Sequence, residues 1–143
     1  MFSISLLPRK IRIYKFTQEE YERHYRLFIK SENIKNIMCL TFLEDEITLY
    51  KYSGEDDTSF MEICNTYDRR EYNIINIHED VPGIDHIGIV HQISGMFVKH
   101  NIPLLYINTY AFNLILISDE FISKALEVFT CIVPNFIIEI DSK

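Results

Sequence analysis

Short apolar runs separated by polar breaks organise the first half of the chain. Residues 11–16 are mostly apolar with Arg12 and Lys15 interleaved, which is typical of a half-buried strand. Thr17 and Glu20 have the spacing of a capping box, and the apolar stripe after them predicts a helix. Two strand-like runs that form a hairpin and one short helix follow. In chain order these elements cover residues 11–16, 17–30, 37–43, 46–52 and 60–64.

The second half repeats this order more completely. A weakly alternating strand leads into a loop, and the helix after it carries an apolar stripe that ends before Pro103. Two further strands come next, and Ser118 is expected to cap a last helix whose first turn holds Asp119 and Glu120. The predicted elements cover residues 72–77, 88–100, 104–109, 112–117, 118–130 and 136–140.

Two copies of one supersecondary pattern predict an α+β fold made of two ferredoxin-like modules (βαββαβ) in tandem. We expect residues 1–68 to form the N-terminal module and residues 69–143 the C-terminal module. Residues 3–7 are expected to add a further strand, and residues 65–70 to connect the modules. The 24 isoleucines against two alanines favour sheet over a helical bundle.

Charge and cysteine content narrow the class of protein. The net charge of −7 argues against a nucleic-acid partner, since that affinity depends on Lys and Arg at phosphates. No apolar run approaches the length that crosses a membrane, and the first ten residues do not resemble a signal peptide. Three separated cysteines without a CxxC pair argue against disulfides and cysteine-based zinc sites. We therefore expect a cytoplasmic protein.

Other groups of polar residues do not have the spacing of metal or catalytic sites. A cluster of histidines and acids lacks metal-ligand spacing, so we expect a solvated loop and no metal. Cys64 and Cys131 lie in no nucleophile motif, so we expect buried thiols, no cofactor and no enzyme activity. The acidic run 55–57 is interpreted as a solvated loop. The cluster comprises His78, Glu79, Asp80, Asp85, His86 and His91.

One stretch of the second half resembles a known family. Gly83-Ile84-Asp85-His86-Ile87-Gly88-Ile89-Val90, together with residues 92–95, 102–110 and 112–120, is similar to the ACT domains of the CASTOR family. The resemblance implies two ACT modules that bind a small amino acid at an interface between modules and signal through a protein partner, as in CASTOR-like nutrient sensing in the TOR pathway. Because the longer relatives have four modules, it also implies a homodimer.

The resemblance assigns candidate ligand-binding residues. At the helix start, backbone N–H groups of Gly88 and Ile89 could hold a carboxylate. Asn113 replaces an aspartate of the family's arginine sensor and Pro103 replaces a serine, which favours a small or neutral amino acid over arginine. The alternative is an interaction-only ACT dimer that has lost its ligand. The implied positions are Ile84, Asp85, His86, Ile87, Gly88, Ile89, Pro103, Leu104, Thr109, Tyr110, Phe112 and Asn113.

Overall fold

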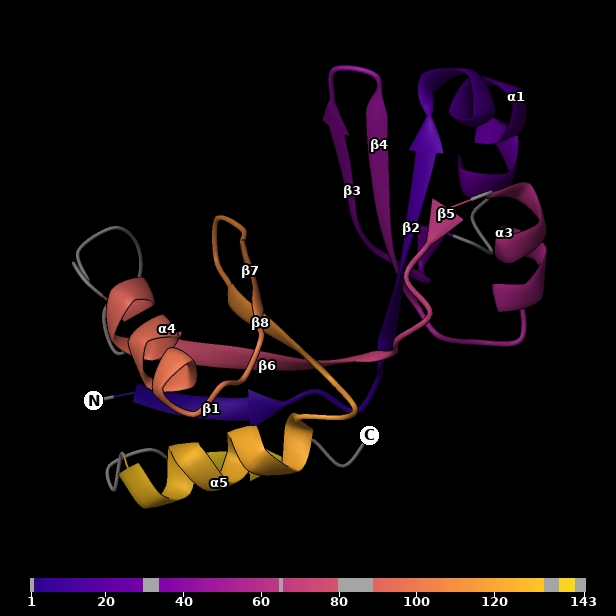
Figure 1. Ribbon diagram of the computed structural model, residues 1–143. Coiled ribbons are helices and arrows are strands. Elements are labelled where there is room, and N and C mark those ends of the chain that lie inside the picture. The colour runs from indigo at the N-terminus through magenta and orange to yellow at the C-terminus, as the bar shows by residue number, and fades with distance from the viewer. Residues whose placement is uncertain (1, 30–33, 65, 80–88, 133–136, 141–143) are drawn as a thin grey trace. The chain divides into compact units, whose positions relative to one another are not determined.

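A computed structural model describes residues 2–29, 34–64, 66–79, 89–132 and 137–140 (Figure 1). The chain divides into two compact units. One unit comprises residues 9–71, which we call the inserted unit. The other combines residues 1–8 with residues 72–143, and we call it the outer unit.

The inserted unit has the order strand, helix, strand, strand, helix, strand. Its sheet pairs β3 with β4, β4 with β2 and β2 with β5, all antiparallel. This is the ferredoxin-like βαββαβ order and strand arrangement. The elements are β2 (Ile11–Thr17), α1 (Gln18–Ile29), β3 (Ile37–Leu43), β4 (Glu46–Tyr52), α3 (Asp57–Ile63) and β5 (Thr66–Tyr67).

Helices α1 and α3 lie together on one side of this sheet and supply Phe28 and Phe60 to the core (Figure 1). The Thr17 half of the capping box predicted at the start of α1 is present, because the Glu20 N–H donates to Thr17 Oγ1 at 3.1 Å; the Glu20 carboxylate accepts from the Thr17 hydroxyl at 3.2 Å. Alternate residues of β2 and β4 face the helices, as a two-residue side-chain period requires. The buried core comprises Tyr14, Phe16, Phe28, Ile47, Leu49, Phe60 and Cys64.

The outer unit repeats the βαββαβ order and adds one strand. Its sheet has the order β7-β8-β6-β1-β9, in which β1 is antiparallel to β6 and parallel to β9. The elements are β1 (Phe2–Leu6), β6 (Tyr72–Glu79), α4 (Ile89–Lys99), β7 (Leu105–Asn108), β8 (Asn113–Ser118), α5 (Ile122–Ile132) and β9 (Ile137–Ile140).

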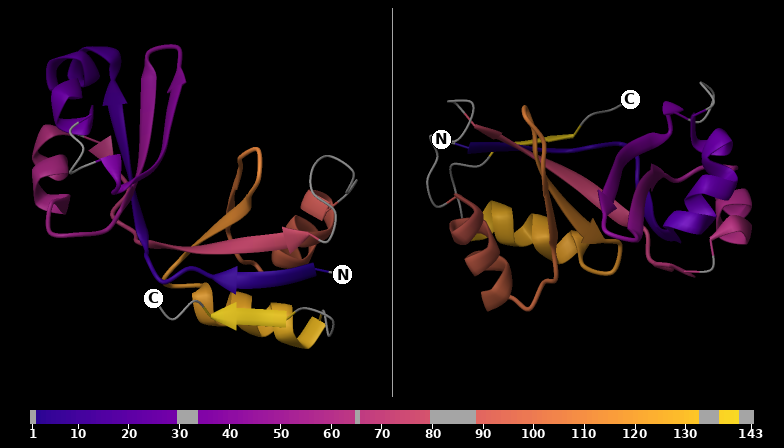
Figure 2. Two further views of the ribbon diagram at one scale, coloured as in Figure 1. Left: turned by 180° about the vertical axis from the view of Figure 1, so that it is seen from behind. Right: turned by 90° about the horizontal axis from the view of Figure 1, so that it is seen from above.

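Helices α4 and α5 cover the same face of the outer unit's sheet, as Figure 2 shows from above. Phe97 of α4 and Phe129 of α5 meet edge to face with ring centroids 5.2 Å apart. Isoleucines of β1, β6 and β8 form the sheet side of this core. Among the described residues, no helix is both long and apolar enough to span a bilayer. The buried core comprises Ile4, Ile75, Ile77, Ile93, Phe97, Ile102, Ile115, Ile117, Ala125, Val128 and Phe129.

The predicted α+β class with βαββαβ order is confirmed in both units. The sequence pattern missed the two-residue strand β5 in a stretch expected to be a connector. The predicted cap at Ser118 is wrong: Ser118 ends β8, and its carbonyl accepts from Phe121 N–H at 2.9 Å in a turn that precedes α5. Asp119 instead accepts a hydrogen bond from Asn73 Nδ2 at 2.7 Å.

The first strand belongs with the second half of the chain. We expected residues 1–68 to form one module, but β1 pairs with β6 and β9, and Leu7 N–H donates to the Ile74 carbonyl at 2.9 Å. These backbone hydrogen bonds group residues 1–8 with residues 72–143. The inserted unit is therefore bracketed in sequence by two segments of the outer unit.

Candidate functional site

Part of the predicted ligand site falls on residues 84–88, which lie outside the described residues. This part includes Ile84, Asp85, His86, Ile87 and Gly88. Ile89 is the first residue of α4. The described positions of the predicted site are therefore Ile89 and the segments around β7 and β8.

The tip of the β7–β8 hairpin carries four of the predicted residues. Thr109 N–H donates to the Phe112 carbonyl at 2.9 Å, and Phe112 N–H donates to Thr109 Oγ1 at 3.0 Å. These two bonds fix the turn, while Tyr110 is fully exposed and the Phe112 side chain is 52% exposed. The tip thus presents two aromatic side chains to solvent.

Strand register brings this tip to the end of β6. Asn113 pairs with Ile77 of β6 on one side and with Asn108 of β7 on the other. Ile77 lies two residues before Glu79, where β6 ends, so Asn113 lies near that end of β6.

Pro103 and Leu104 lie at the other end of β7. Pro103 is exposed, whereas Leu104 packs against the core of the outer unit. The four-residue strand β7 separates them from Thr109, which corresponds to roughly 15 Å along an extended chain. One copy of the outer unit therefore does not bring Pro103 and Leu104 beside the hairpin tip.

A cavity in the inserted unit was not predicted from the sequence. It has a volume of about 300 Å³ and lies between the first turns of α1 and the β3–β4 hairpin. Gln18, Tyr21 and Glu22 line it from one face of α1, since residues at spacings of three and four share a helix face. The hairpin side is lined by Phe42, Glu44 and Ile47. The spacing of Gln18, Tyr21 and Glu22 on α1 could have indicated one wall of the cavity. The other wall depends on how β3 and β4 pair, which local spacing does not show.

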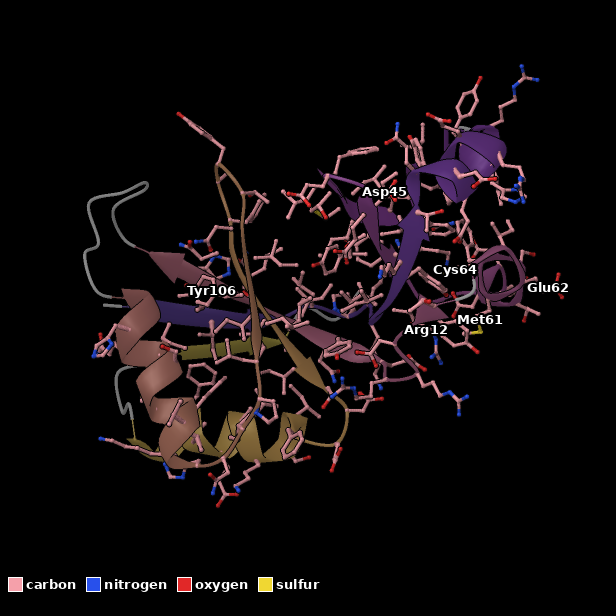
Figure 3. The ribbon with its side chains drawn as sticks, turned by 45° about the horizontal axis from the view of Figure 1, so that its top comes forward. Arg12, Asp45, Met61, Glu62, Cys64 and Tyr106 are labelled. Carbon is pink, nitrogen blue, oxygen red and sulfur yellow. The ribbon has the colours of Figure 1, made fainter. Side chains whose placement is uncertain are left out.

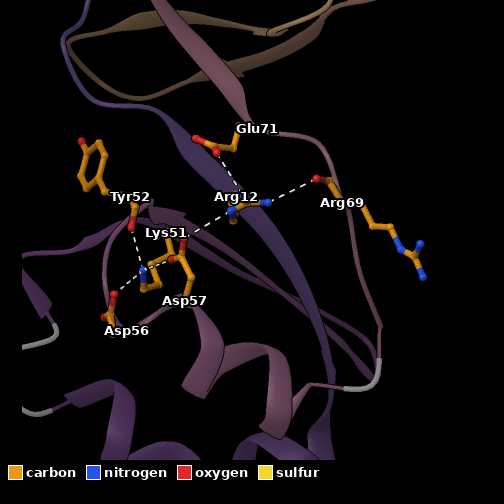
Figure 4. Close-up of polar contacts among 7 residues, drawn as sticks. All are labelled: Arg12, Lys51, Tyr52, Asp56, Asp57, Arg69 and Glu71. Atoms are coloured by element: carbon orange, nitrogen blue, oxygen red, sulfur yellow. Dashed lines mark hydrogen bonds and ion pairs between the residues drawn. The ribbon is translucent and has the colours of Figure 1, made fainter.

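A network of charged side chains surrounds the buried Lys51 at the start of α3 (Figure 4). The Lys51 side chain is 1% exposed, and its ammonium group lies 2.7 Å from a carboxylate oxygen of Asp56, 2.7 Å from one of Asp57 and 2.7 Å from the Tyr52 carbonyl. Three acceptors match the three ammonium hydrogens. The acidic run predicted as a solvated loop is therefore wrong for Asp56 and Asp57, which are partly buried because Lys51 lies beneath them.

Arg12 extends this network to the end of the inserted unit. Its Nε lies 3.2 Å from Asp57 Oδ2, and its terminal nitrogens donate to Glu71 at 2.9 Å and to the Arg69 carbonyl at 3.2 Å. Burial and the neighbouring Asp57 raise the pKa of Tyr14, which lies on the same face of β2, well above its ordinary value. The network connects β2, β4, α3 and the segment that follows β5.

The thiol of Cys64 is held inside the core of the inserted unit. It is 1% exposed and lies 2.7 Å from the Lys15 carbonyl and 2.5 Å from the Thr66 carbonyl. Burial raises the pKa of this thiol. A buried thiol of raised pKa is a poor nucleophile at neutral pH. Within the described ranges, no group of three His, Cys, Asp or Glu residues has metal-binding geometry.

A sequence comparison relates the C-terminal part of the chain to a known kind of domain. Residues 69–130 match the family model of the ACT domain. The match spans α4 and the β7–β8 hairpin, which hold the described positions of the predicted site. No curated protein matches this chain.

Solved structures share the fold of nearly the whole chain at low identity. A protein of Agrobacterium tumefaciens is 10% identical with a TM-score of 0.67, covering 99% of this chain and 95% of that one. A protein of Porphyromonas gingivalis W83, described as a C-terminal regulatory domain of aspartate kinase, is 12% identical with a TM-score of 0.61, at 91% and 95% coverage. The aspartate kinase of Clostridium acetobutylicum is 10% identical with a TM-score of 0.61, at 90% and 33% coverage. These similarities extend the fold relationship to both units.

Proposed function

We propose that this chain is a non-enzymatic regulatory protein that binds a small amino acid and transmits its binding to a protein partner. The ACT match over residues 69–130 carries the proposal. The likeness to a domain described as regulatory in aspartate kinase supports it at the level of fold. We place this function in the cytoplasm, as cysteine usage predicts.

The proposed ligand site lies at the sheet end where β6 ends and the β7–β8 hairpin turns. Its residues are the twelve implied by the sequence resemblance, of which Ile89, Thr109, Tyr110, Phe112 and Asn113 are near this end by topology and register. Pro103 and Leu104 lie at the far end of β7, so in this proposal they come from a second copy. The functional form is accordingly a homodimer.

The side chains at this end favour an uncharged ligand side chain. Asn113 offers an amide where a guanidinium would need a carboxylate for a charge-assisted pair. Pro103 offers no backbone donor. We therefore propose a small or neutral amino acid rather than arginine. CASTOR-like sensing in the TOR pathway rests on the sequence resemblance alone.

Thermal unfolding with each of the twenty amino acids tests this function. A ligand that binds only the folded chain stabilises it by RT ln(1 + [L]/Kd), which is about 2.7 kcal/mol at a hundredfold excess over Kd. We expect one or a few neutral amino acids to raise the unfolding midpoint. A flat response to all twenty contradicts amino-acid binding, and a light-scattering mass of one chain contradicts the homodimer.

A second candidate is an ACT dimer that has lost its ligand and acts only through protein contacts. The exposed aromatic side chains of Tyr110 and Phe112 favour it, because apolar side chains at a hairpin tip suit a protein interface. In that case the double variant Pro103→Ser with Asn113→Asp is expected to gain arginine binding that the parent lacks. Arginine binding by the parent contradicts this candidate.

A further inference from the structure

The cavity between α1 and the β3–β4 hairpin of the inserted unit combines aromatic rings with carboxylates. Tyr21 and Phe42 meet edge to face with centroids 5.2 Å apart and planes at 87°. Phe42 is 59% exposed, so part of its ring faces the open space. Ile47, which is buried, pairs with Phe42 across the strands and forms an apolar floor.

Two carboxylates complete the lining of this cavity. Glu22 comes from the second turn of α1 and Glu44 from the hairpin turn. Gln18 Nε2 donates to Glu22 Oε1 at 3.2 Å, which holds that carboxylate at the cavity side of α1. The six lining residues include no lysine, arginine or histidine. The cavity is therefore negative at its polar positions.

The nearby helix N-terminus does not offset this charge. Thr17 Oγ1 accepts from the Glu20 N–H and so caps the helix, and Glu19 and Glu20 both lie in the first turn. The Arg23 side chain pairs with Glu19 at 3.0 Å and does not line the cavity. An anionic ligand would thus meet carboxylates rather than free N–H donors.

Glu44 occupies its position at a conformational cost. It has a φ of 53° in the two-residue turn between Leu43 and Glu46, a backbone conformation that favours glycine or asparagine. A glutamate therefore stands where a local preference would put a smaller residue.

We propose that this cavity binds an organic cation, with an ammonium or guanidinium group on a short apolar stem. Carboxylates of Glu22 and Glu44 form charge-assisted hydrogen bonds to the cationic group, and the exposed ring of Phe42 attracts it through its π face, while Tyr21, stacked on Phe28, holds Phe42 in place. The volume of about 300 Å³ lies at the lower bound of small-molecule sites. This site lies in the inserted unit and does not depend on the amino-acid site proposed at the β7–β8 hairpin.

Calorimetric titration of the full chain with n-butylguanidinium tests the inference, and n-butylurea is the matched neutral probe of the same shape. Neither probe has the α-amino and α-carboxylate groups of an amino acid, so the result is separate from that of the ligand screen. We expect saturable binding of the guanidinium, weaker binding at higher salt, and no measurable binding of the urea. Equal binding of both probes, or no binding of either, overturns the inference.

Variants locate the binding. Glu44→Gln and Glu22→Gln keep the side-chain shape and each is expected to weaken guanidinium binding about tenfold. Glu62→Gln on α3, an exposed residue that does not line the cavity and is labelled in Figure 3, is the control and is expected to change nothing. Urea unfolding midpoints confirm that all three variants fold. Equal affinities for Glu44→Gln and Glu62→Gln overturn the assignment.

Discussion

Arg12 and Lys51 lie directly opposite one another on the antiparallel strands β2 and β4, and the Asp57 carboxylate contacts both. Like charges in this cross-strand position normally destabilise a sheet. Here Asp57 bridges them, with one oxygen 3.2 Å from Arg12 Nε and the other 2.7 Å from Lys51 Nζ. The first residue of α3 is therefore what makes this pair of cations tolerable.

Asp57→Asn is expected to destabilise the inserted unit by about 3 kcal/mol, because it leaves two facing cations with one carboxylate fewer. Asp57 is 17% and Lys51 1% exposed, so solvent screens the loss only in part. Urea unfolding measures the change, and amide hydrogen exchange over residues 9–71 assigns it to this unit. Glu19→Gln breaks the exposed pair with Arg23 and is the matched control, with an expected loss of about 0.3–0.5 kcal/mol. Equal losses in both variants contradict the bridging role.

Tyr14 is expected to make the chain sensitive to alkaline pH. Burial, and next the charge of Asp57, raise the pKa of its hydroxyl in the folded state above the ordinary value near 10. The folded state then holds a proton that the unfolded state releases, so the stability is present below about pH 10 and is lost as pH rises further. Tyr14→Phe removes this dependence. Urea unfolding between about pH 9 and about pH 11 is expected to show a shallower decline for the variant.

Tyr50 and Cys64 also have raised pKa values and contribute to the same decline, so the informative quantity is the difference between the two proteins. Identical slopes for wild type and Tyr14→Phe contradict the assignment.

The periodicity of apolar residues was sufficient to predict most of the helices and strands, because the buried side of each element determines the spacing of its apolar residues. It was not sufficient to find the partner of β1, since strand pairing joins residues far apart in sequence, such as Ile4 and Ile77. The sequence therefore contains no local pattern that predicts the insertion of one unit into the other.

The burial of Lys51 could have been predicted from its spacing in the sequence. Lys51 follows Ile47 and Leu49 at a spacing of two, which places it on the core-facing side of β4. A lysine on that face requires carboxylates nearby, and Asp56 and Asp57 follow within six residues. The candidate ligand site stays a prediction, and the contribution proposed for Pro103 and Leu104 requires a second copy, for which the sequence has no local signal.

Cys64 is expected to react with an alkylating reagent more slowly than Cys39. Cys64 is buried among carbonyl oxygens, whereas Cys39 is half-buried on β3, and burial raises the pKa of both thiols. Because the pKa of both thiols is raised, the accessibility of each thiol to the reagent decides which cysteine reacts faster. The measurement is the labelling rate of each residue by mass spectrometry in a Cys131→Ser background, with a denatured control in which the rates become similar. Fast labelling of native Cys64 contradicts the structural role and reopens a thiol-dependent activity.

Phe97→Ala in the core of the outer unit is expected to lower the free energy of unfolding much more than Phe112→Ala at the hairpin tip. Phe97 is fully buried against Phe129, so its truncation leaves a cavity and costs about 3–5 kcal/mol. Phe112 is 52% exposed at the tip, so the same truncation is expected to cost less than about 1 kcal/mol. Urea unfolding at a fixed chain concentration measures both, because the proposed dimerisation would couple stability to concentration. A loss at Phe112 as large as that at Phe97 would mean that the tip is buried in solution, and light scattering of the same variant would then show whether a second copy covers it.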